Sequence, residues 1–65
     1  MKVKFTDSGS GRLVLDTETE AVPRRDEMVV IDDVVYECRG VKHVLAPVRG
    51  GRYTYAAEVQ IKPVR

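Results

Sequence analysis

The chain lacks most of the features that small proteins use to stabilise a fold or to carry out chemistry. Its 65 residues include one cysteine, one histidine, one phenylalanine and no tryptophan. A single cysteine excludes an internal disulfide, and no CxxC or HxxxH spacing indicates a metal site. A chain of this length buries only about 60% of the surface that its unfolded form exposes. We therefore expect one domain, residues 1–65, with a thin core, no metal and no cofactor.

Long apolar runs are also missing from the sequence. The N-terminus has no stretch that would indicate a signal peptide, and no segment approaches the length of a membrane span. The unpaired cysteine fits a reducing compartment. These features predict a cytoplasmic protein with no membrane association. A hydrophobic content of 43% predicts that the chain folds.

The charges are distributed unevenly along the chain. Residues 1–38 contain five basic and nine acidic groups, whereas residues 39–65 contain six basic groups and one acidic group. This asymmetry is typical of an anion-binding surface, but it also lets two halves of one domain attract each other. For a single small domain we favour the second interpretation, because it needs no ligand.

The most informative stretch is residues 28–36, in which two β-branched runs flank the pair Asp32-Asp33. Aspartate tolerates the positive φ that a two-residue hairpin loop requires. We therefore predict a tight hairpin in which Ile31 faces Val34, with the remaining pairs following in antiparallel register.

This register makes both faces of the hairpin apolar near its turn. Val29, Ile31 and Tyr36 share one face, whereas Met28, Val30 and Val35 share the other. A hairpin with one face in water normally alternates apolar and polar residues. The set Met28, Val30 and Val35 is therefore either covered by the N-terminal strands or exposed as a surface for self-association or a protein partner.

Alternating apolar and polar residues predict further strands, at residues 2–6, 12–19, 34–46 and 53–64. In the second of these we expect Leu13 and Leu15 to face the core and Val14 to lie on the surface. No window has the 3.6-residue apolar period of a helix.

Residues 34–46 are long for a single strand. After Gly40 the apolar alternation is shifted by one position, so that Val41 and Leu45 follow a different parity from Cys38. An isolated glycine in a strand is typical of a β-bulge. We predict a bulge at Arg39-Gly40, which would turn both apolar sets toward the core.

The stretch from Pro23 to Tyr36, continued from Val41 to Leu45, resembles the two-strand core of SH3-like small barrels. In those domains a charged turn leads into an apolar strand, a tight acidic turn and a bent strand. The chain differs in having Arg25 where such barrels often carry a glycine. The resemblance implies an all-β, small five-stranded antiparallel barrel or roll. Similar barrels in bacterial and phage accessory proteins bind proteins or nucleic acids or serve assembly, so it implies a fold and not a function.

The segment Arg49-Gly50-Gly51-Arg52, followed by two tyrosines, is the most suggestive local motif. Glycines allow close backbone approach to a phosphate, arginines bind it with two donors each, and tyrosines stack on bases. The simpler interpretation is a soluble hairpin turn, with the tyrosines packed in the core. The candidate nucleic-acid or anion site comprises Arg39, Lys42, Arg49, Arg52, Tyr53 and Tyr55.

The sequence contains no catalytic constellation. A two-residue loop at Gly50-Gly51 would place His43 opposite Glu58, but a nucleophile or metal to work with such a pair is missing. The bulge could instead turn His43 inward. Cys38 is best explained as a small buried thiol.

We therefore predict a non-enzymatic binding module that acts through protein contacts, in an accessory, assembly or inhibitory role. Its partner would be another protein or a second copy of the chain. The alternative is a nucleic-acid-binding barrel that uses Arg49 to Tyr55, although the net charge of only +1 disfavours it. A small anion or nucleotide pocket between protomers is a third option.

Overall fold

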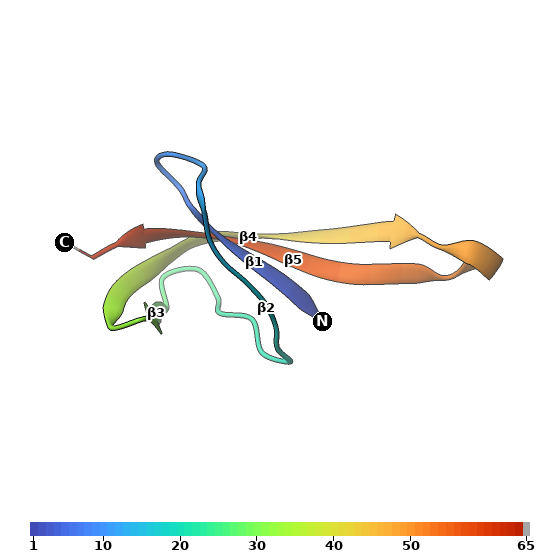
Figure 1. The fold of residues 1–65 in the computed structure, drawn as a ribbon, viewed down its shortest axis with the longest axis horizontal. Helices are drawn as coiled ribbons and strands as arrows, with labels where there is room; N and C mark the ends of the chain where they lie inside the picture. The colour runs from blue at the N-terminus through green and yellow to red at the C-terminus, as the bar shows by residue number, and fades with distance from the viewer. Residues whose placement is uncertain (65) are drawn as a thin grey trace.

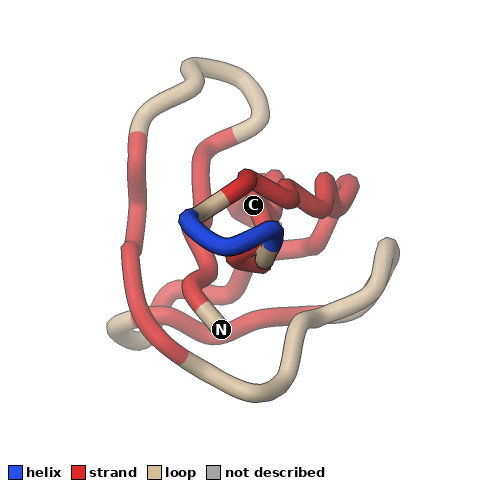
Figure 2. The backbone as a smooth tube through the Cα atoms, turned by 90° about the vertical axis from the view of Figure 1, so that its right-hand side faces the viewer, coloured by secondary structure: helices blue, strands red, loops and turns tan. Residues whose placement is uncertain are grey.

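The computed structural model describes residues 1–64, which fold as five strands in one sheet. The strands are β1 (Lys2–Asp7), β2 (Leu13–Glu18), β3 (Met28–Ile31), β4 (Val34–Pro47) and β5 (Tyr53–Pro63). The sheet has the order β2-β1-β5-β4-β3 and curls into a nearly closed barrel (Figure 2). Within residues 1–64 the helical content is a single 3₁₀ turn, Arg49–Gly51 (Figure 2). The predicted small five-stranded all-β fold is confirmed, and it is consistent with an SH3-like resemblance at the level of the fold.

One detail of the predicted sheet is wrong, because the sheet is mixed and not purely antiparallel. β1 runs parallel to β5, with Lys2 opposite Ala56 and Asp7 opposite Ile61, and the other neighbouring pairs are antiparallel. A short loop makes the two strands that it joins antiparallel, but it does not constrain strands that are far apart in the sequence. β1 and β5 lie far apart in the sequence, so their relative direction depends on how the sheet curls.

The β3–β4 hairpin has the predicted register. Met28 lies opposite Glu37 and Ile31 lies opposite Val34. Asp32 and Asp33 have φ values of 51° and 69°, the left-handed conformation of a two-residue hairpin loop. The aspartate pair therefore sets which residues share each face of this hairpin.

The predicted bulge in β4 is also confirmed. Cys38 lies opposite Ile61 and Gly40 lies opposite Gln60, which leaves Arg39 as the extra residue. Because of this extra residue, Cys38 before the bulge and Val41 after it both pack on the core. One long strand can thus bend with the sheet and keep its apolar side inward.

A second bulge, in β2, overturns the prediction for Leu13 and Val14. Phe5 lies opposite Leu15 and Thr6 lies opposite Leu13, so Val14 is the extra residue. Val14 and Leu15 are half-buried against the core, whereas Leu13 is 55% exposed. The bulge reverses the alternation of side chains, which a reading of the regular pattern cannot detect.

The core is small and lies inside the curl of the sheet. Its buried residues come from β1, β3, β4 and β5: Val3, Phe5, Ile31, Cys38, Ala57, Val59 and Ile61. The segment between β2 and β3 crosses the open side of the barrel and packs Val22 against this core. Backbone hydrogen bonds from Asp26 N–H to Cys38 O and from Cys38 N–H to Glu27 O tie this segment to β4.

The far end of the β4–β5 hairpin extends beyond the barrel as a two-stranded arm, residues 45–55. β1 accompanies β5 only as far as Ala56, and β3 accompanies β4 only as far as Glu37. The molecule is consequently elongated, with extents of 46 × 22 × 18 Å (Figure 1). In the described part of the chain, no third strand pairs with the arm and none of the buried core residues belongs to it.

The bulge in β2 is tested by a matched pair of substitutions. We expect Val14→Ser to lower the free energy of unfolding by about 1–2 kcal/mol, because it removes a packed side chain. Leu13→Ser should change it by less than about 0.5 kcal/mol, because Leu13 is exposed. Urea denaturation of the two variants measures this difference, and a larger loss for Leu13→Ser would contradict the assigned register.

Candidate functional site

Met28, Val30 and Val35 form an exposed apolar surface on β3 and β4. Their exposed fractions are 60%, 63% and 43%, so the N-terminal strands do not cover them. The N–H of Val64 donates to the carbonyl oxygen of Val35 at 3.0 Å, which places the 48% exposed Val64 beside Val35. We call Met28, Val30, Val35 and Val64 the valine patch. Sequence reasoning missed Val64, because the pairing of residues beyond Pro63 depends on the register of β5.

Acidic residues border one end of the valine patch. The exposed Asp32-Asp33 turn follows Val30 and precedes Val35 by two positions each. At the other end, Glu37 lies opposite Lys62 and forms an ion pair with Arg39 at 3.4 Å. The ion pairs found within residues 1–64 do not involve Asp32 or Asp33. Among residues 1–64, the two turn carboxylates beside this apolar surface therefore form no ion pair.

The arm presents a second apolar surface on the face that continues from the core. Leu45 lies opposite Tyr55 and Pro47 lies opposite Tyr53, on the same face as the core pair Val41 and Val59. Leu45, Tyr53 and Tyr55 are 64%, 64% and 46% exposed. The expectations that Leu45 faces the core and that the tyrosines are buried are therefore wrong. These residues share the core face, but the barrel ends before it reaches them.

The predicted pairing of His43 with Glu58 is also wrong. The N–H of Val48 donates to Arg52 O at 2.7 Å, so the loop encloses three residues, Arg49–Gly51, where a two-residue loop was expected. One additional residue shifts the register by one position, placing His43 opposite Ala57 and on the inner face. There its Nδ1 lies 2.5 Å from the Tyr55 hydroxyl.

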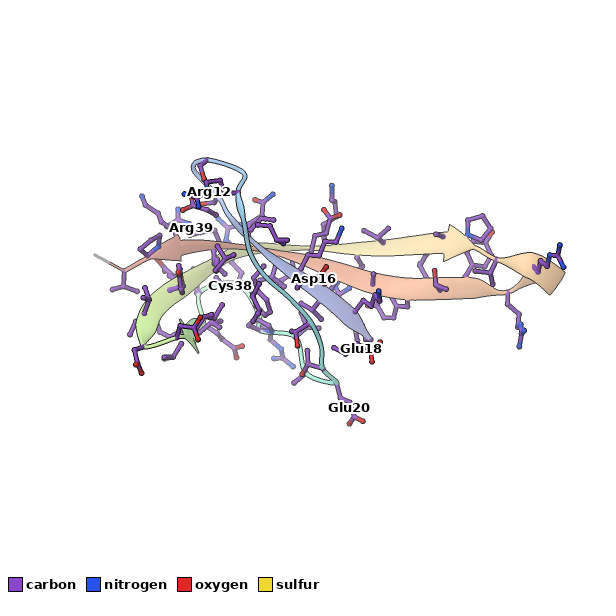
Figure 3. All side chains as sticks on the ribbon, viewed as in Figure 1. Arg12, Asp16, Glu18, Glu20, Cys38 and Arg39 are labelled. Carbon is purple, nitrogen blue, oxygen red and sulfur yellow. The ribbon has the colours of Figure 1, made fainter. Side chains whose placement is uncertain are left out.

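The six basic and aromatic residues predicted as one site are not brought together. Arg49 and Arg52 lie at the tip of the arm, and Tyr53 and Tyr55 lie along its inner face. Lys42 lies on the opposite face and forms an ion pair with Glu58 at 3.4 Å. Arg39 lies at the bulge near the barrel end of the sheet, far from the tip (Figure 3). The arm therefore retains four of the six residues.

The outer face of the sheet carries an alternating row of charges across four strands. Asp16 lies opposite Lys4, Lys4 opposite Glu58, and Glu58 opposite Lys42. The acidic side chains of β2 follow one another along the strand (Figure 3). Cross-strand pairs of opposite charge stabilise a sheet modestly. The pairs Asp16–Lys4 and Lys42–Glu58 each lie within one half of the chain, so the attraction expected between the acidic and the basic half stays a prediction.

A groove of about 590 Å³ lies where the arm joins the barrel. Arg24, Arg25 and His43 line it, over apolar side chains that include Val22 and Val41. Neither arginine belongs to the site predicted from the sequence. Only the crossing of the 19–27 segment over β4 brings them near His43.

Cys38 is fully buried and bonds to the carbonyl oxygen of Gly40 at 3.8 Å. Burial raises the pKa of its thiol above the ordinary value of 9.0, and the negative charges of Glu27 and Asp26 add to this effect. A neutral buried thiol is a poor nucleophile. The arrangement supports a structural role for Cys38.

The raised pKa of Cys38 predicts a pH-dependent stability. The folded protein keeps the thiol protonated at pH values where the unfolded chain releases the proton. Its contribution is fully present below the ordinary pKa of 9.0 and is lost as the pH rises through the folded pKa. Above about pH 9 the free energy of unfolding should therefore fall more steeply for the parent than for Cys38→Ala. Urea titrations across this range measure both slopes, and equal slopes would contradict the prediction.

Two further observations concern residues 1–64. No helix in this part of the chain is long and apolar enough to cross a membrane. The described residues contain no group of three or more histidine, cysteine or acidic side chains that could hold a metal ion.

No protein-family model, curated protein or solved structure matches the chain.

Proposed function

We propose that this protein is a non-enzymatic binding module that acts through protein contacts, in an accessory, assembly or inhibitory role. The observation that carries the proposal is the valine patch. Its four apolar side chains are 43–63% exposed and adjoin one another on β3, on β4 and at Val64, directly after the end of β5. Contiguous apolar surface of this kind is typical of interaction sites.

The position of the patch at a sheet edge supports the same proposal. β3 is an outer strand of the sheet and leaves the backbone groups of one side without a neighbouring strand. A partner can add a strand to such an edge and bury the adjacent apolar side chains at once. Each fully buried valine or methionine contributes about 1.5–3 kcal/mol relative to its exposed state.

The chemically reactive side chains support a non-enzymatic role. Cys38 is buried, and its raised pKa disfavours the thiolate. His43 bonds to the hydroxyl of Tyr55 and lies opposite Ala57, so the acid–base couple with Glu58 is not formed. Neither residue is arranged as an activated nucleophile or a general base.

Site-specific photo-crosslinking in cells tests the proposal. We expect a crosslinker at position 28 to yield a defined protein adduct, either with another protein or with a second copy. The double substitution Val30→Thr/Val35→Thr should reduce this adduct more than about tenfold, because burying two hydroxyls in place of methyl groups weakens the contact by about 1.4 kcal/mol or more. Threonine retains β-branching, so the fold should persist.

A crosslinker at Arg12, an exposed position outside the patch, is the matched control. Its adducts should not respond to the threonine substitutions. The proposal fails if position 28 gives no more adduct than position 12.

A second candidate function is binding of single-stranded nucleic acid by the arm. The observation that favours it is the exposure of Tyr53 and Tyr55 on the face beside Arg49 and Arg52. Exposed aromatic rings can stack on bases while arginines contact the phosphates. Only four of the six candidate residues lie on the arm, which limits the surface to a few nucleotides.

An amide NMR titration with short oligonucleotides tests this second candidate. If it holds, salt-sensitive shifts should be confined to the arm, and Arg49→Ala/Arg52→Ala should weaken binding at least about tenfold through the loss of two phosphate contacts. Lys42→Ala, on the opposite face, is the control and should leave the affinity within about threefold. Unchanged affinity in the arginine variant would exclude this function.

A further inference from the structure

The valine patch and the inner face of the arm lie at opposite ends of the same strand. The patch adjoins the start of β4, and the arm contains its end. Ten residues separate Val35 from Leu45, or about 30 Å of extended strand. The two surfaces therefore cannot cover each other within one chain (Figure 1).

Within residues 1–64, the arm pairs with no third strand. A two-stranded hairpin without a third strand or a covering element is only marginally stable in water. The arm nevertheless directs three exposed apolar side chains, Leu45, Tyr53 and Tyr55, to one face. Covering this face would extend the core beyond the end of the barrel.

The charges beside the two surfaces are complementary. Arg49 and Arg52 flank the glycines at the tip, and both are exposed. Asp32 and Asp33 form the exposed turn beside the valine patch. The ion pairs within residues 1–64 involve none of these four side chains. Each apolar surface thus ends in two charges of one sign, and the signs are opposite.

We propose that the partner of the valine patch is a second copy of this chain, whose arm lies across the patch with its arginine tip at the Asp32-Asp33 turn. This inference rests on the proposed function and names the partner. Leu45, Tyr53 and Tyr55 of one copy cover Met28, Val30 and Val35 of the next. The contact is head-to-tail, so repetition gives a closed ring or an open filament.

A charge exchange between the two surfaces tests the proposal. Sedimentation velocity should show a mass that rises with protein concentration and falls with salt, because screening weakens the ion pairs. Arg49→Glu/Arg52→Glu should weaken association more than about tenfold. Asp32→Lys/Asp33→Gly should do the same, and its glycine suits the positive φ of 69° at that position.

Mixing these two variants provides the decisive result. The acidic arm of the first fits the basic turn of the second, and the basic arm of the second fits the acidic turn of the first. Equimolar mixing should restore association to within about threefold of the parent. Arg12→Glu/Arg25→Glu has the same charge change as the arginine-tip variant, at exposed positions outside both surfaces, and should associate like the parent.

Several results would overturn this inference. A monomer at every accessible protein concentration would do so, as would charge variants that associate like the parent or a mixture that stays dissociated. Asp32→Asn/Asp33→Gly removes both charges and keeps a favourable turn, so weaker association of this variant cannot be attributed to a misfolded hairpin. If the protein is monomeric and oligonucleotides shift the amide NMR signals of the arm, the arm is a nucleic-acid-binding surface and not a contact between copies.

These outcomes separate the inference from the function on which it rests. A monomer that still gives a specific protein adduct from position 28 would retain the binding module and exclude the second copy. If the protein gives neither the adduct nor self-association, both the proposed binding module and the second copy as its partner are excluded.

Discussion

The antiparallel pairing of β4 with β5 is the interaction on which the rest of the structure depends. It joins Tyr36 to Pro63 at one end and Pro47 to Tyr53 at the other. Its barrel half supplies Cys38, Val59 and Ile61 to the core, and its distal half forms the arm. This single strand pair, interrupted at the bulge, therefore sets the distance between the valine patch and the arm. The bulge at Arg39 keeps the apolar side chains before and after it on the same side of this long ribbon.

Many of the apolar side chains of this chain are exposed and do not contribute to its core. Within residues 1–64, seven residues form the buried core, whereas several large apolar side chains lie on the surface, including Leu45, Tyr53 and Tyr55. A chain of this size has too few residues outside the sheet to bury both of its faces. Association with another chain would bury the exposed apolar groups and would stabilise the arm. Under the proposed function, the same contacts would stabilise the protein and carry out its role.

The charged residues divide into two groups with different consequences. Asp16, Lys4, Glu58 and Lys42 alternate across the outer face and largely compensate one another. The arginines of the arm tip and the Asp32-Asp33 turn lie at the two ends of β4, where one chain cannot bring them together. The first group contains two charges of each sign and adds nothing to the net charge of +1. The second gives the molecule a polarity along its length.

The sequence by itself determined the five strands, the Asp32-Asp33 turn, the register of the β3–β4 hairpin and the bulge at Arg39-Gly40. These features depend on neighbouring residues, because turn chemistry and the period-2 alternation act over short distances. Only the tertiary structure decided the parallel pairing of β1 with β5, the reversed burial of Leu13 and Val14, and the three-residue loop that moved His43 away from Glu58. A one-residue change in a bulge or a loop transfers every later side chain to the other face. The sequence also identified the apolar character of Met28, Val30 and Val35, but their exposure depends on where strands distant in sequence end.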